Sequence, residues 1–190
     1  MKIIGLYSPY PQMGKNTFAD ELATIATPTA TVSFAEAFRN VVVDFVSDFF
    51  PGGEAEVRAW LSDERKDRKL VPGLGVTLRH MLQTIGHSWG RKLVHPDIWV
   101  MKAKAALRRL HNYRVVIFDD LRYENEYHML VREGAALIRI ERKDAPQAQE
   151  HESNARLEGM EFDYHVSNDG DVEELQAKAR LIAQSEGVLA

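Results

Sequence analysis

The sequence predicts an α/β protein with three layers, in which helices cover both faces of a five-stranded parallel sheet. Short apolar runs typical of buried strands occupy residues 2–7, 31–34, 114–118, 136–141 and 164–167. Segments with a helical spacing of apolar residues lie between these runs, and such alternation predicts parallel strands joined by crossover helices. The helices are expected at residues 15–26, 35–50, 77–92, 98–110, 120–133 and 172–185.

The composition bounds the classes of protein to consider. The 190 residues are expected to form a single domain, with a helical insert that binds the substrate at residues 35–112, between the second and third strands. A net charge of −4 argues against a nucleic acid polymer as partner. No run approaches the roughly 20 apolar residues of a membrane span, and the chain opens directly with a strand, so we expect neither a membrane segment nor a signal peptide. The absence of cysteine agrees with a reducing cytoplasm.

The first strand is followed by the loop SPYPQMGKNT, which leads into a helix opening at Lys15. A strand, a tight loop and a helix that opens on Gly-Lys predict a P-loop, whose backbone N–H groups surround a phosphate. Lys15 is expected to reach the β- and γ-phosphates of ATP, and the Thr17 hydroxyl to hold Mg²⁺. The residues expected to bind ATP are Gln12, Met13, Gly14, Lys15, Asn16 and Thr17.

Two positions of this loop depart from the usual pattern, G-x-x-x-x-G-K-[ST]. Pro9 stands where the first glycine is usual, and Asn16 separates the lysine from the threonine. The ending G-K-x-T is typical of the loops of nucleoside monophosphate kinases. An ordinary turn before a helix is the alternative interpretation.

A second charged site is expected after the third strand. Four apolar residues followed by Asp119 and Asp120 have the Walker B form, in which a carboxylate holds Mg²⁺. The sequence leaves open which aspartate faces the metal. Arg122 lies at the tip of the same strand and is the strongest candidate to bind the phosphate of a substrate, with an ion pair to a nearby carboxylate as the alternative.

The insert offers further candidates. Arg39 is expected in the first turn of its helix, as a phosphate ligand or as a solvated side chain. In the segment 77–92, Arg79, Gln83, Gly86 and Gly90 form a polar stripe beside the apolar one. The two glycines predict close approach, either by a flat ligand beneath Arg79 and Gln83 or by another helix. Gln83 can both donate to and accept from a base edge, and Arg91 can reach a phosphate.

Two further segments, at residues 54–76 and 142–160, are rich in polar residues. The charge run SDERKDRK within residues 54–76 indicates a solvated face or a mobile flap. Residues 142–160 lie where monophosphate kinases carry a lid, so Arg142 is expected to bind the donor phosphates or to stack on the adenine. His151, in the same segment, is expected to be exposed rather than catalytic.

Four blocks of the sequence resemble the bacteriophage-type deoxynucleoside monophosphate kinases. They are GKNT, LQTIGHSWGRKLVHPDIWV, D-x-R-Y-x-N-E and IRIER, and the tail FDYHVSNDGDVEEL is also similar. The resemblance implies a P-loop kinase fold and transfer of a phosphoryl group from ATP, with Mg²⁺, to a deoxynucleoside 5′-monophosphate. It implies that Lys15, Asp120, Arg122 and Arg142 are catalytic. It also implies that Thr17 serves the metal, together with Asp119 or Asp120, and that Arg79, Gln83, Arg91 and Arg122 bind the substrate.

Other functions stay open on the sequence alone. The chain could be a P-loop kinase of another small acceptor, such as dephospho-coenzyme A or phosphomevalonate, which would not need Gln83 to read a base. It could also be a nucleotide-binding protein without an acceptor, although such a protein has no evident use for Arg122. The sequence leaves the accepted bases, the choice of ribose or deoxyribose and the existence of a homodimer undecided. The expected location is the cytoplasm, which is that of the host if the protein is viral.

Overall fold

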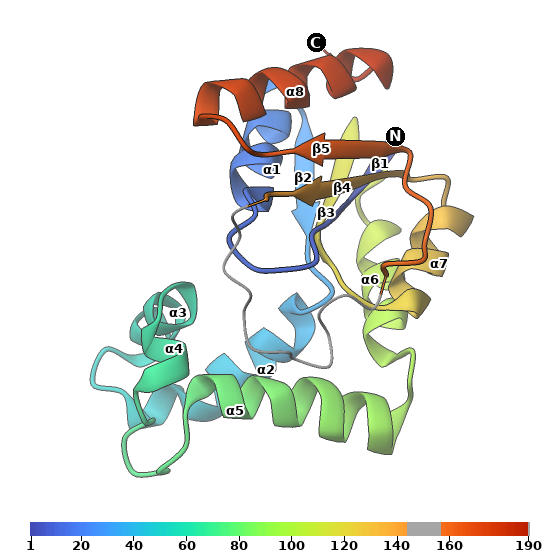
Figure 1. Cartoon of the computed structure of the whole chain (residues 1–190). Helices are drawn as coiled ribbons and strands as arrows, with labels where there is room; N and C mark the ends of the chain where they lie inside the picture. Colours follow the sequence, from blue (N-terminus) through green and yellow to red (C-terminus); the bar gives the residue numbers. More distant parts are fainter. Residues whose placement is uncertain (144–156, 190) are drawn as a thin grey trace. The chain divides into compact units, whose positions relative to one another are not determined.

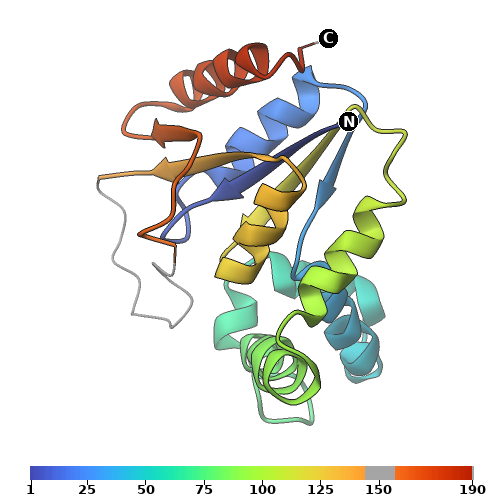
Figure 2. The same ribbon diagram turned by 90° about the vertical axis from the view of Figure 1, so that its right-hand side faces the viewer.

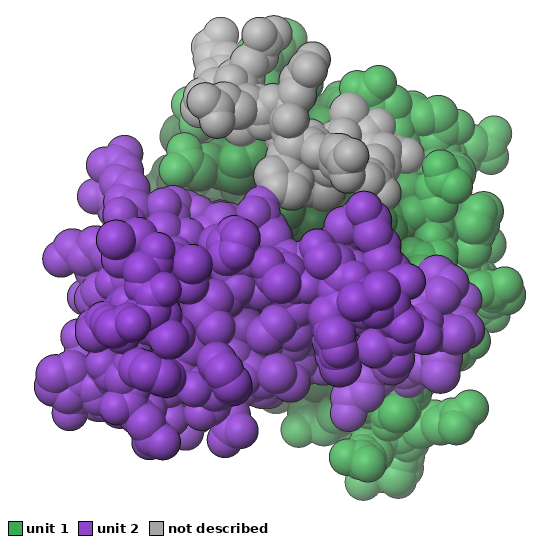
Figure 3. All heavy atoms as spheres, turned by 90° about the horizontal axis from the view of Figure 1, so that it is seen from below, with its two compact units in different colours: residues 1–34, 103–190 green, residues 35–102 purple. Residues whose placement is uncertain are grey.

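The structure is a computed structural model, and it describes residues 1–143 and 157–189 (Figure 1). The chain divides into two compact units. Unit 1 comprises Met1–Phe34 and Ala103–Ala190, and unit 2 comprises Ala35–Lys102. The two units are coloured separately in Figure 3. We describe each unit by itself.

Unit 1 is built on a five-stranded sheet in which every pair of neighbours is parallel. The strand order is β2-β3-β1-β4-β5. The strands are β1 (Lys2–Tyr7), β2 (Thr29–Val32), β3 (Val115–Leu121), β4 (Ala136–Glu141) and β5 (Tyr164–Ser167). The predicted α/β fold class with five parallel strands is confirmed.

Helices lie on both faces of this sheet (Figure 2). Helices α1 (Lys15–Ile25) and α8 (Val172–Ser185) pack against each other on one face. Helix α7 (Glu124–Arg132) packs on the other face, where the side chain of Leu130 reaches Gly5. Because side chains alternate along a strand, Ile4 and Leu6 point to the α1 face while Gly5 points to α7.

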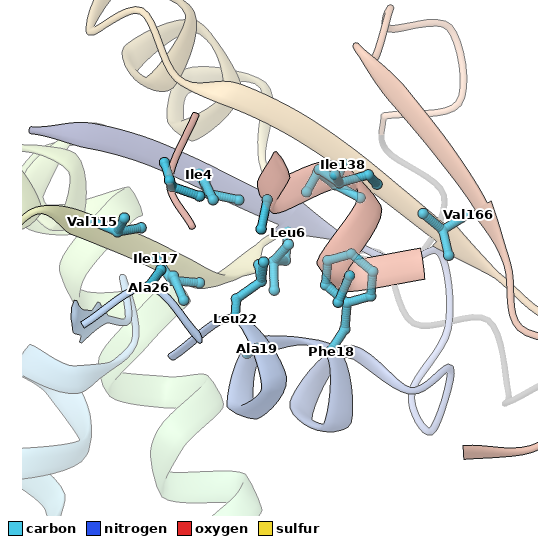
Figure 4. Packing of buried hydrophobic residues seen from close by; sticks show 14 of the residues in the cluster. Ile4, Leu6, Phe18, Ala19, Leu22, Ala26, Val115, Ile117, Ile138 and Val166 are labelled. Carbon is cyan, nitrogen blue, oxygen red and sulfur yellow. The ribbon is translucent and has the colours of Figure 1, made fainter. Parts of the chain in front are cut away.

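The main hydrophobic core lies between the sheet and the helices α1 and α8. Figure 4 shows its side chains from β1, β3 and β4 pointing toward Phe18 and Leu22 of α1. Ile4, Leu6, Phe18 and Leu22 are all fully buried. Burial of four such side chains contributes roughly 1.5–3 kcal/mol each. This core fixes the strand edge from which the P-loop emerges.

Unit 2 is helical. Its elements are α2 (Glu36–Val46), the 3₁₀ turn η1 (Ser47–Phe49), α3 (Gly53–Ser62), α4 (Arg65–Arg68), α5 (Leu78–Gln83) and the π-helical segment η2 (Thr84–Val94). Helix α6 (Ile98–Leu107) begins in unit 2 and ends in unit 1. A separate core joins these helices, with Val42, Val57, Trp60, Leu78 and Leu82 among its members. The segment 35–112 was predicted as an insert that binds the acceptor, and that role stays a prediction.

Two strand boundaries were predicted wrongly. Strand β2 begins two residues earlier than expected and ends at Val32, because Ser33 and Phe34 leave the sheet to bind Asp120. Strand β3 extends to Leu121 rather than ending at residue 118. A bulge explains the extension, since the partner of β1 advances from Phe118 to Leu121 while β1 advances only from Gly5 to Tyr7.

Several helix boundaries also differ from the prediction. The helix expected at residues 35–50 ends at Val46 and continues as the 3₁₀ turn η1. The helix expected at 98–110 ends at Leu107, and the one expected at 120–133 begins only at Glu124. Thr77 caps α5 as predicted, with its Oγ1 accepting from the His80 N–H at 3.1 Å. The helix beyond it changes to π geometry, which the periodicity did not indicate.

Within residues 54–76 only the charge run at 62–69 was interpreted. The segment forms most of α3 and all of α4, and its Leu70 makes a short antiparallel bridge to Thr77. The solvated-face interpretation is confirmed, since Arg68 and Glu64 form an ion pair of 2.9 Å with side chains 75% and 70% exposed. Among the helices of the described residues, none is both long and apolar enough to cross a membrane.

The two glycines of η2 serve helix packing. A Cβ at Gly90 would lie 2.4 Å from the ring of Trp99, and one at Gly86 would lie 3.1 Å from the ring of Phe38. The Trp99 indole N–H also donates to the Gly86 carbonyl at 2.7 Å. Of the two explanations for these glycines, close packing is therefore the one that the structure confirms, and aromatic side chains occupy the space once considered for a ligand.

Candidate functional site

The loop between β1 and α1 carries the backbone conformation of an anion site. Gln12 has a φ of 61° and Gly14, the N-cap of α1, has a φ of 92°, so both adopt the left-handed conformation. Left-handed residues within a tight turn let successive backbone N–H groups converge on one point, as in the phosphate nests of P-loops. The positive end of the α1 dipole lies at the same place. The local backbone can therefore hold a phosphate.

The loop emerges at the centre of the sheet. Strand β1 lies between β3 and β4, and all carboxyl ends of the parallel strands meet at one edge. From β1 the chain crosses to β2 and then to β3, which both lie on one side of β1 in the sheet. From β3 it crosses to β4, which lies on the other side of β1. In doubly wound sheets this reversal of direction marks the ligand site.

Four charged side chains gather where β1 and β3 end. Burial and, to a smaller extent, the nearby Arg122 lower the pKa of Lys15, and Asp120 and Asp119 oppose them, so that the pKa lies at about 8. Two cations and two carboxylates therefore act on one another at this edge. A lysine whose charge is partly desolvated binds an anion more strongly than a fully hydrated one. The group is suited to receive the phosphates of a nucleotide.

The two aspartates have different surroundings. Asp120 accepts a hydrogen bond from the Ser33 hydroxyl and another from the Phe34 N–H at 2.8 Å. Asp120 thereby fixes the chain where it leaves β2. Asp119 precedes it in β3 and is half-buried. The structure thus shows a structural role for Asp120, whereas the sequence assigned it only to the metal and to catalysis.

The backbone of Arg122 is held by a buried carboxylate. Glu126, which is 2% exposed, accepts from the N–H groups of Arg122 at 2.9 Å and of Tyr123 at 3.1 Å. These bonds close the first turn of α7 and set the position from which the Arg122 side chain extends. The side chain itself is exposed. The motif D-x-R-Y-x-N-E thus contains both an arginine and the residue that positions it.

A cavity of about 520 Å³ opens beside the P-loop in unit 1. Its size is in the range of sites for small organic ligands. Four residues predicted to bind ATP line it, namely Gln12, Gly14, Thr17 and Arg142. The sequence analysis missed the others, which are Asn168, Gly170, Asp171, Val172, Glu173 and Leu175. A turn N-D-G-D at the carboxyl end of a predicted strand was the signal that could have pointed to them.

Asp169 lies between two residues that line the cavity, Asn168 and Gly170. Its carboxylate accepts from the Lys143 N–H at 2.8 Å and from the Ser167 hydroxyl at 2.7 Å. These bonds, with the charge of Lys143, lower the pKa of Asp169 to about 2. They tie the end of β4 to the turn after β5, and Arg142 is the residue next to Lys143. The described part of the predicted lid at residues 142–160 ends here and resumes at Leu157, so most of that lid and His151 lie outside the described residues.

The candidates of unit 2 occupy three different elements. Arg39 is exposed on α2. Arg79, on α5, donates to Asp67 of α4 at 2.6 Å. Gln83 ends α5 and is half-buried, and Arg91 of η2 donates to the Pro96 carbonyl at 3.3 Å. The binding roles predicted for these residues stay predictions.

The oxygen atoms at this edge fit Mg²⁺. The candidates are the Thr17 hydroxyl and the carboxylates of Asp119 and Asp120. Mg²⁺ prefers such oxygens and commonly takes one or two carboxylates together with the phosphates of a nucleotide and water. No group of three or more His, Cys, Asp or Glu side chains that could hold a metal ion occurs within residues 1–143 and 157–189.

Comparison with solved structures shows a shared fold. The chain is similar to the dephospho-CoA kinase from Campylobacter jejuni, with 14% identity, a TM-score of 0.50 and 97% of each chain covered. It is also similar to the tunicamycin resistance protein of Deinococcus radiodurans, with 13% identity and a TM-score of 0.48 over 100% of this chain and 99% of that one. None of the curated proteins matches the sequence.

Comparison with protein families identifies the chain. The family model of deoxynucleotide monophosphate kinases matches residues 63–179, more than half of the sequence. The matched range holds Asp119, Asp120, Arg122 and Asn168, while the P-loop lies before it. The chain belongs to the deoxynucleotide monophosphate kinase family and is a kinase that phosphorylates deoxynucleoside monophosphates.

Proposed function

We propose that the enzyme uses ATP and Mg²⁺ and that its donor site is the P-loop with the adjoining cavity of unit 1. The observation that carries this proposal is the group of Lys15, Arg122, Asp119 and Asp120, which interact where β1 and β3 end. Gly14 and Thr17, on either side of Lys15, line the cavity together with Arg142. One site can thus hold both the triphosphate chain of ATP and its adenine base.

In the proposed reaction an oxygen of the acceptor 5′-phosphate attacks the γ-phosphorus of ATP. A new P–O bond forms to the acceptor, the bond between the γ-phosphorus and the β,γ-bridging oxygen breaks, and ADP leaves. Bound Mg²⁺ would neutralise charge on the β- and γ-phosphates. Lys15 and Arg122 would hold the transferred group between donor and acceptor, since the transition state needs positioning and positive charge more than a base.

The other roles follow from the placement of each arginine. Arg142 lines the donor cavity and is proposed to contact the donor phosphates or the adenine. Arg122 is proposed to bind the acceptor phosphate. Arg39, Arg79, Gln83 and Arg91 of unit 2 are proposed to bind the acceptor nucleotide, with Gln83 reading the base edge. The expected compartment is the cytoplasm, where both nucleotides occur.

The test is ADP release from ATP and Mg²⁺ with each deoxynucleoside monophosphate and its ribose counterpart. Release stimulated only by certain deoxynucleotides is expected, and it would also give the base specificity. If no monophosphate stimulates release while dephospho-coenzyme A does, the proposed acceptor is wrong. If ATP binds but no acceptor stimulates release, the protein is a nucleotide-binding protein instead.

Two variants separate the donor side from the acceptor side. Lys15→Met is expected to lower kcat/KM by roughly 100-fold or more, because it removes a charge that stabilises the transferred group. Arg122→Ala is expected to raise the KM of the acceptor strongly and to spare ATP binding. Arg132→Ala is the matched control, because Arg132 is an exposed arginine in the last turn of α7. Equal loss of both affinities in Arg122→Ala would contradict its acceptor assignment.

A further inference from the structure

The turn after β5 reaches the P-loop through one amide side chain. Asn168 follows the last residue of β5 and donates from its Nδ2 to the Met13 carbonyl at 3.1 Å. Asn168 and Met13 are far apart in the chain, and each belongs to unit 1. On the sequence alone, Asn168 is only one residue of the similar tail FDYHVSNDGDVEEL, and no role was predicted for it.

The Asn168 amide also packs closely against Gly14. A Cβ built on Gly14 would lie 2.5 Å from the Asn168 Nδ2 and 2.8 Å from a methyl of Leu175. No side chain other than hydrogen fits at Gly14 without displacing these groups. Gly14 therefore has two reasons to be glycine, namely its φ of 92° and the approach of the Asn168 amide.

Asn168 is itself anchored to the sheet. Its backbone N–H donates to the Glu141 carbonyl at the end of β4 at 2.7 Å. The neighbouring Asp169 binds the Lys143 N–H, so two consecutive residues of the turn are fixed to the segment that leaves β4. The amide of Asn168 thus acts from a rigid support rather than from a free loop.

The hydrogen bond sets the orientation of one peptide plane. In a trans peptide the carbonyl and the following N–H point in opposite directions. Because the Met13 carbonyl accepts from Asn168, the N–H of Gly14 points away from the Asn168 amide. In a P-loop, inward N–H groups bind the phosphate and outward carbonyls keep away from it.

We propose that Asn168 is a positioning residue, which turns the Met13–Gly14 peptide so that the Gly14 N–H is presented to the donor phosphates. The role rests on the proposed donor site at the P-loop. Asn168 acts through the loop backbone and not by contact with the transferred group. If its side chain were lost, the peptide could rotate and present a carbonyl dipole to the phosphates, which would repel them.

Isothermal calorimetry with two probes tests this role, because Asn168 also lines the cavity that would hold the base. The probes are ATP and inorganic tripolyphosphate, each with Mg²⁺, titrated into the full chain. The variants are Asn168→Ala and Asn168→Leu, of which the second keeps most of the side-chain volume but cannot donate. Gln184→Ala is the control, since Gln184 carries an exposed amide side chain in the last turn of α8 and does not line the cavity.

Both Asn168 variants are expected to weaken ATP and tripolyphosphate by the same factor, about tenfold for one hydrogen bond. The acceptor KM is expected to stay unchanged, which a general loss of structure would not produce. Gln184→Ala is expected to leave both affinities within about twofold of those of the unaltered protein.

Other outcomes overturn the proposal in distinguishable ways. A loss confined to ATP, with tripolyphosphate unaffected, would mean that Asn168 contacts the base and does not orient the loop. If both Asn168 variants bind ATP and tripolyphosphate as tightly as the unaltered protein, Asn168 does not position the P-loop. If the unaltered protein binds neither probe, the assignment of the donor site itself is wrong, and the role of Asn168 is refuted with it.

Discussion

At the scale of single residues, Glu126 and Asp120 show that buried or half-buried carboxylates build this site by binding backbone. Glu126 accepts from the N–H groups of Arg122 and Tyr123, and Asp120 accepts from that of Phe34. Asp120 lies in the last part of β3 and Glu126 in the first turn of α7, and each fixes a short segment that carries or adjoins a proposed functional group. Ser8, Glu21 and Glu126 are the buried polar or charged residues of the described chain, so such positions are rare.

Glu126→Ala is predicted to cost about 1–3 kcal/mol of unfolding free energy, because two backbone N–H groups lose their partner. The same change should raise the acceptor KM several-fold, since the segment that carries Arg122 is no longer fixed. Denaturant unfolding and steady-state kinetics measure the two effects. Glu126→Gln keeps an acceptor oxygen and should cost less in both. An alanine variant with unchanged stability and unchanged KM would refute this role for Glu126.

Gln12 provides a test of strain in the P-loop. Its φ of 61° is unfavourable for any residue with a side chain, at a cost of roughly 1–2 kcal/mol. Gln12→Gly is predicted to recover up to about 1 kcal/mol of stability after the added flexibility of the unfolded chain is counted. Gln12→Val should lose stability, because a branched side chain tolerates this conformation least. Thermal unfolding of the two variants decides, and a valine variant as stable as the original chain would exclude strain at Gln12.

Sequence alone could predict those site residues that belong to a motif of neighbouring residues with a known chemical role. Gly14, Lys15 and Thr17 follow a strand at a characteristic spacing, and Asp119 and Asp120 end an apolar run. Asn168 could not be predicted in its structural role, because that role depends on β5 lying near the P-loop after a long chain separation. The structural role of Asp120 was missed for the same reason, since its partners Ser33 and Phe34 precede it by most of the first half of the chain.

At the scale of secondary-structure elements, the same distinction explains which boundaries were predicted. Helix α8 and strands β1, β4 and β5 have the predicted ends, because local periodicity and turn residues determine them. The ends of β2 and β3 were wrong because a bulge and a hydrogen bond to Asp120 determine them. Helices α3 and α4 were not recognised, since charged residues cover most of their surface and few apolar positions reveal the period.

In the π-helical segment η2, the usual preference for alanine over glycine within a helix is predicted to be reversed. In an exposed helix, glycine to alanine stabilises by about 1 kcal/mol. At Gly90 the new methyl would meet the Trp99 ring at 2.4 Å and the Ile85 carbonyl at 2.9 Å. Gly90→Ala is therefore predicted to destabilise by about 1–3 kcal/mol, as expected for overpacking.

Gly86→Ala is the matched comparison for that change. Its methyl would lie 3.1 Å from the Phe38 ring, so a small shift relieves it and the cost should be lower than at Gly90. Denaturant unfolding of both variants gives the order. If Gly90→Ala were as stable as the original chain or more stable, the close packing of Trp99 on η2 would not be what requires glycine.

At the scale of the whole molecule, charge is arranged locally against an acidic average. The chain carries a net charge of −4, yet Lys15, Arg122 and Arg142 adjoin the edge where nucleotide phosphates would bind. A favourable local potential can therefore coexist with an overall charge that disfavours nucleic acid polymers. The two ends of the described chain lie near each other in unit 1 (Figure 2), and an ion pair between Lys2 and Glu186 joins them.

Glu186 is the centre of that arrangement. It forms an ion pair with Lys2 of β1 and accepts from the Tyr164 hydroxyl of β5 at 2.6 Å. Burial raises the pKa of Glu186, but the bonds from Lys2 and Tyr164 outweigh burial and lower it below the ordinary 4.5. Three elements that are distant in sequence, β1, β5 and the end of α8, are thus joined through one carboxylate.

The pH dependence of stability follows from the sign of this shift. A carboxylate whose pKa is lower in the folded state than in the unfolded state stabilises the fold above its unfolded pKa of 4.5. That contribution is lost as the pH falls through the lower folded-state value. Glu186→Gln should therefore cost about 1 kcal/mol near neutral pH, a value for a partly exposed ion pair with one further hydrogen bond. The difference from the original chain should shrink as the pH falls below 4.5, because both proteins then carry a neutral group at this position. Urea unfolding of the two proteins across this range measures it, and a difference that stays constant with pH would mean that the shape of the side chain, and not its charge, holds the ends of the chain together.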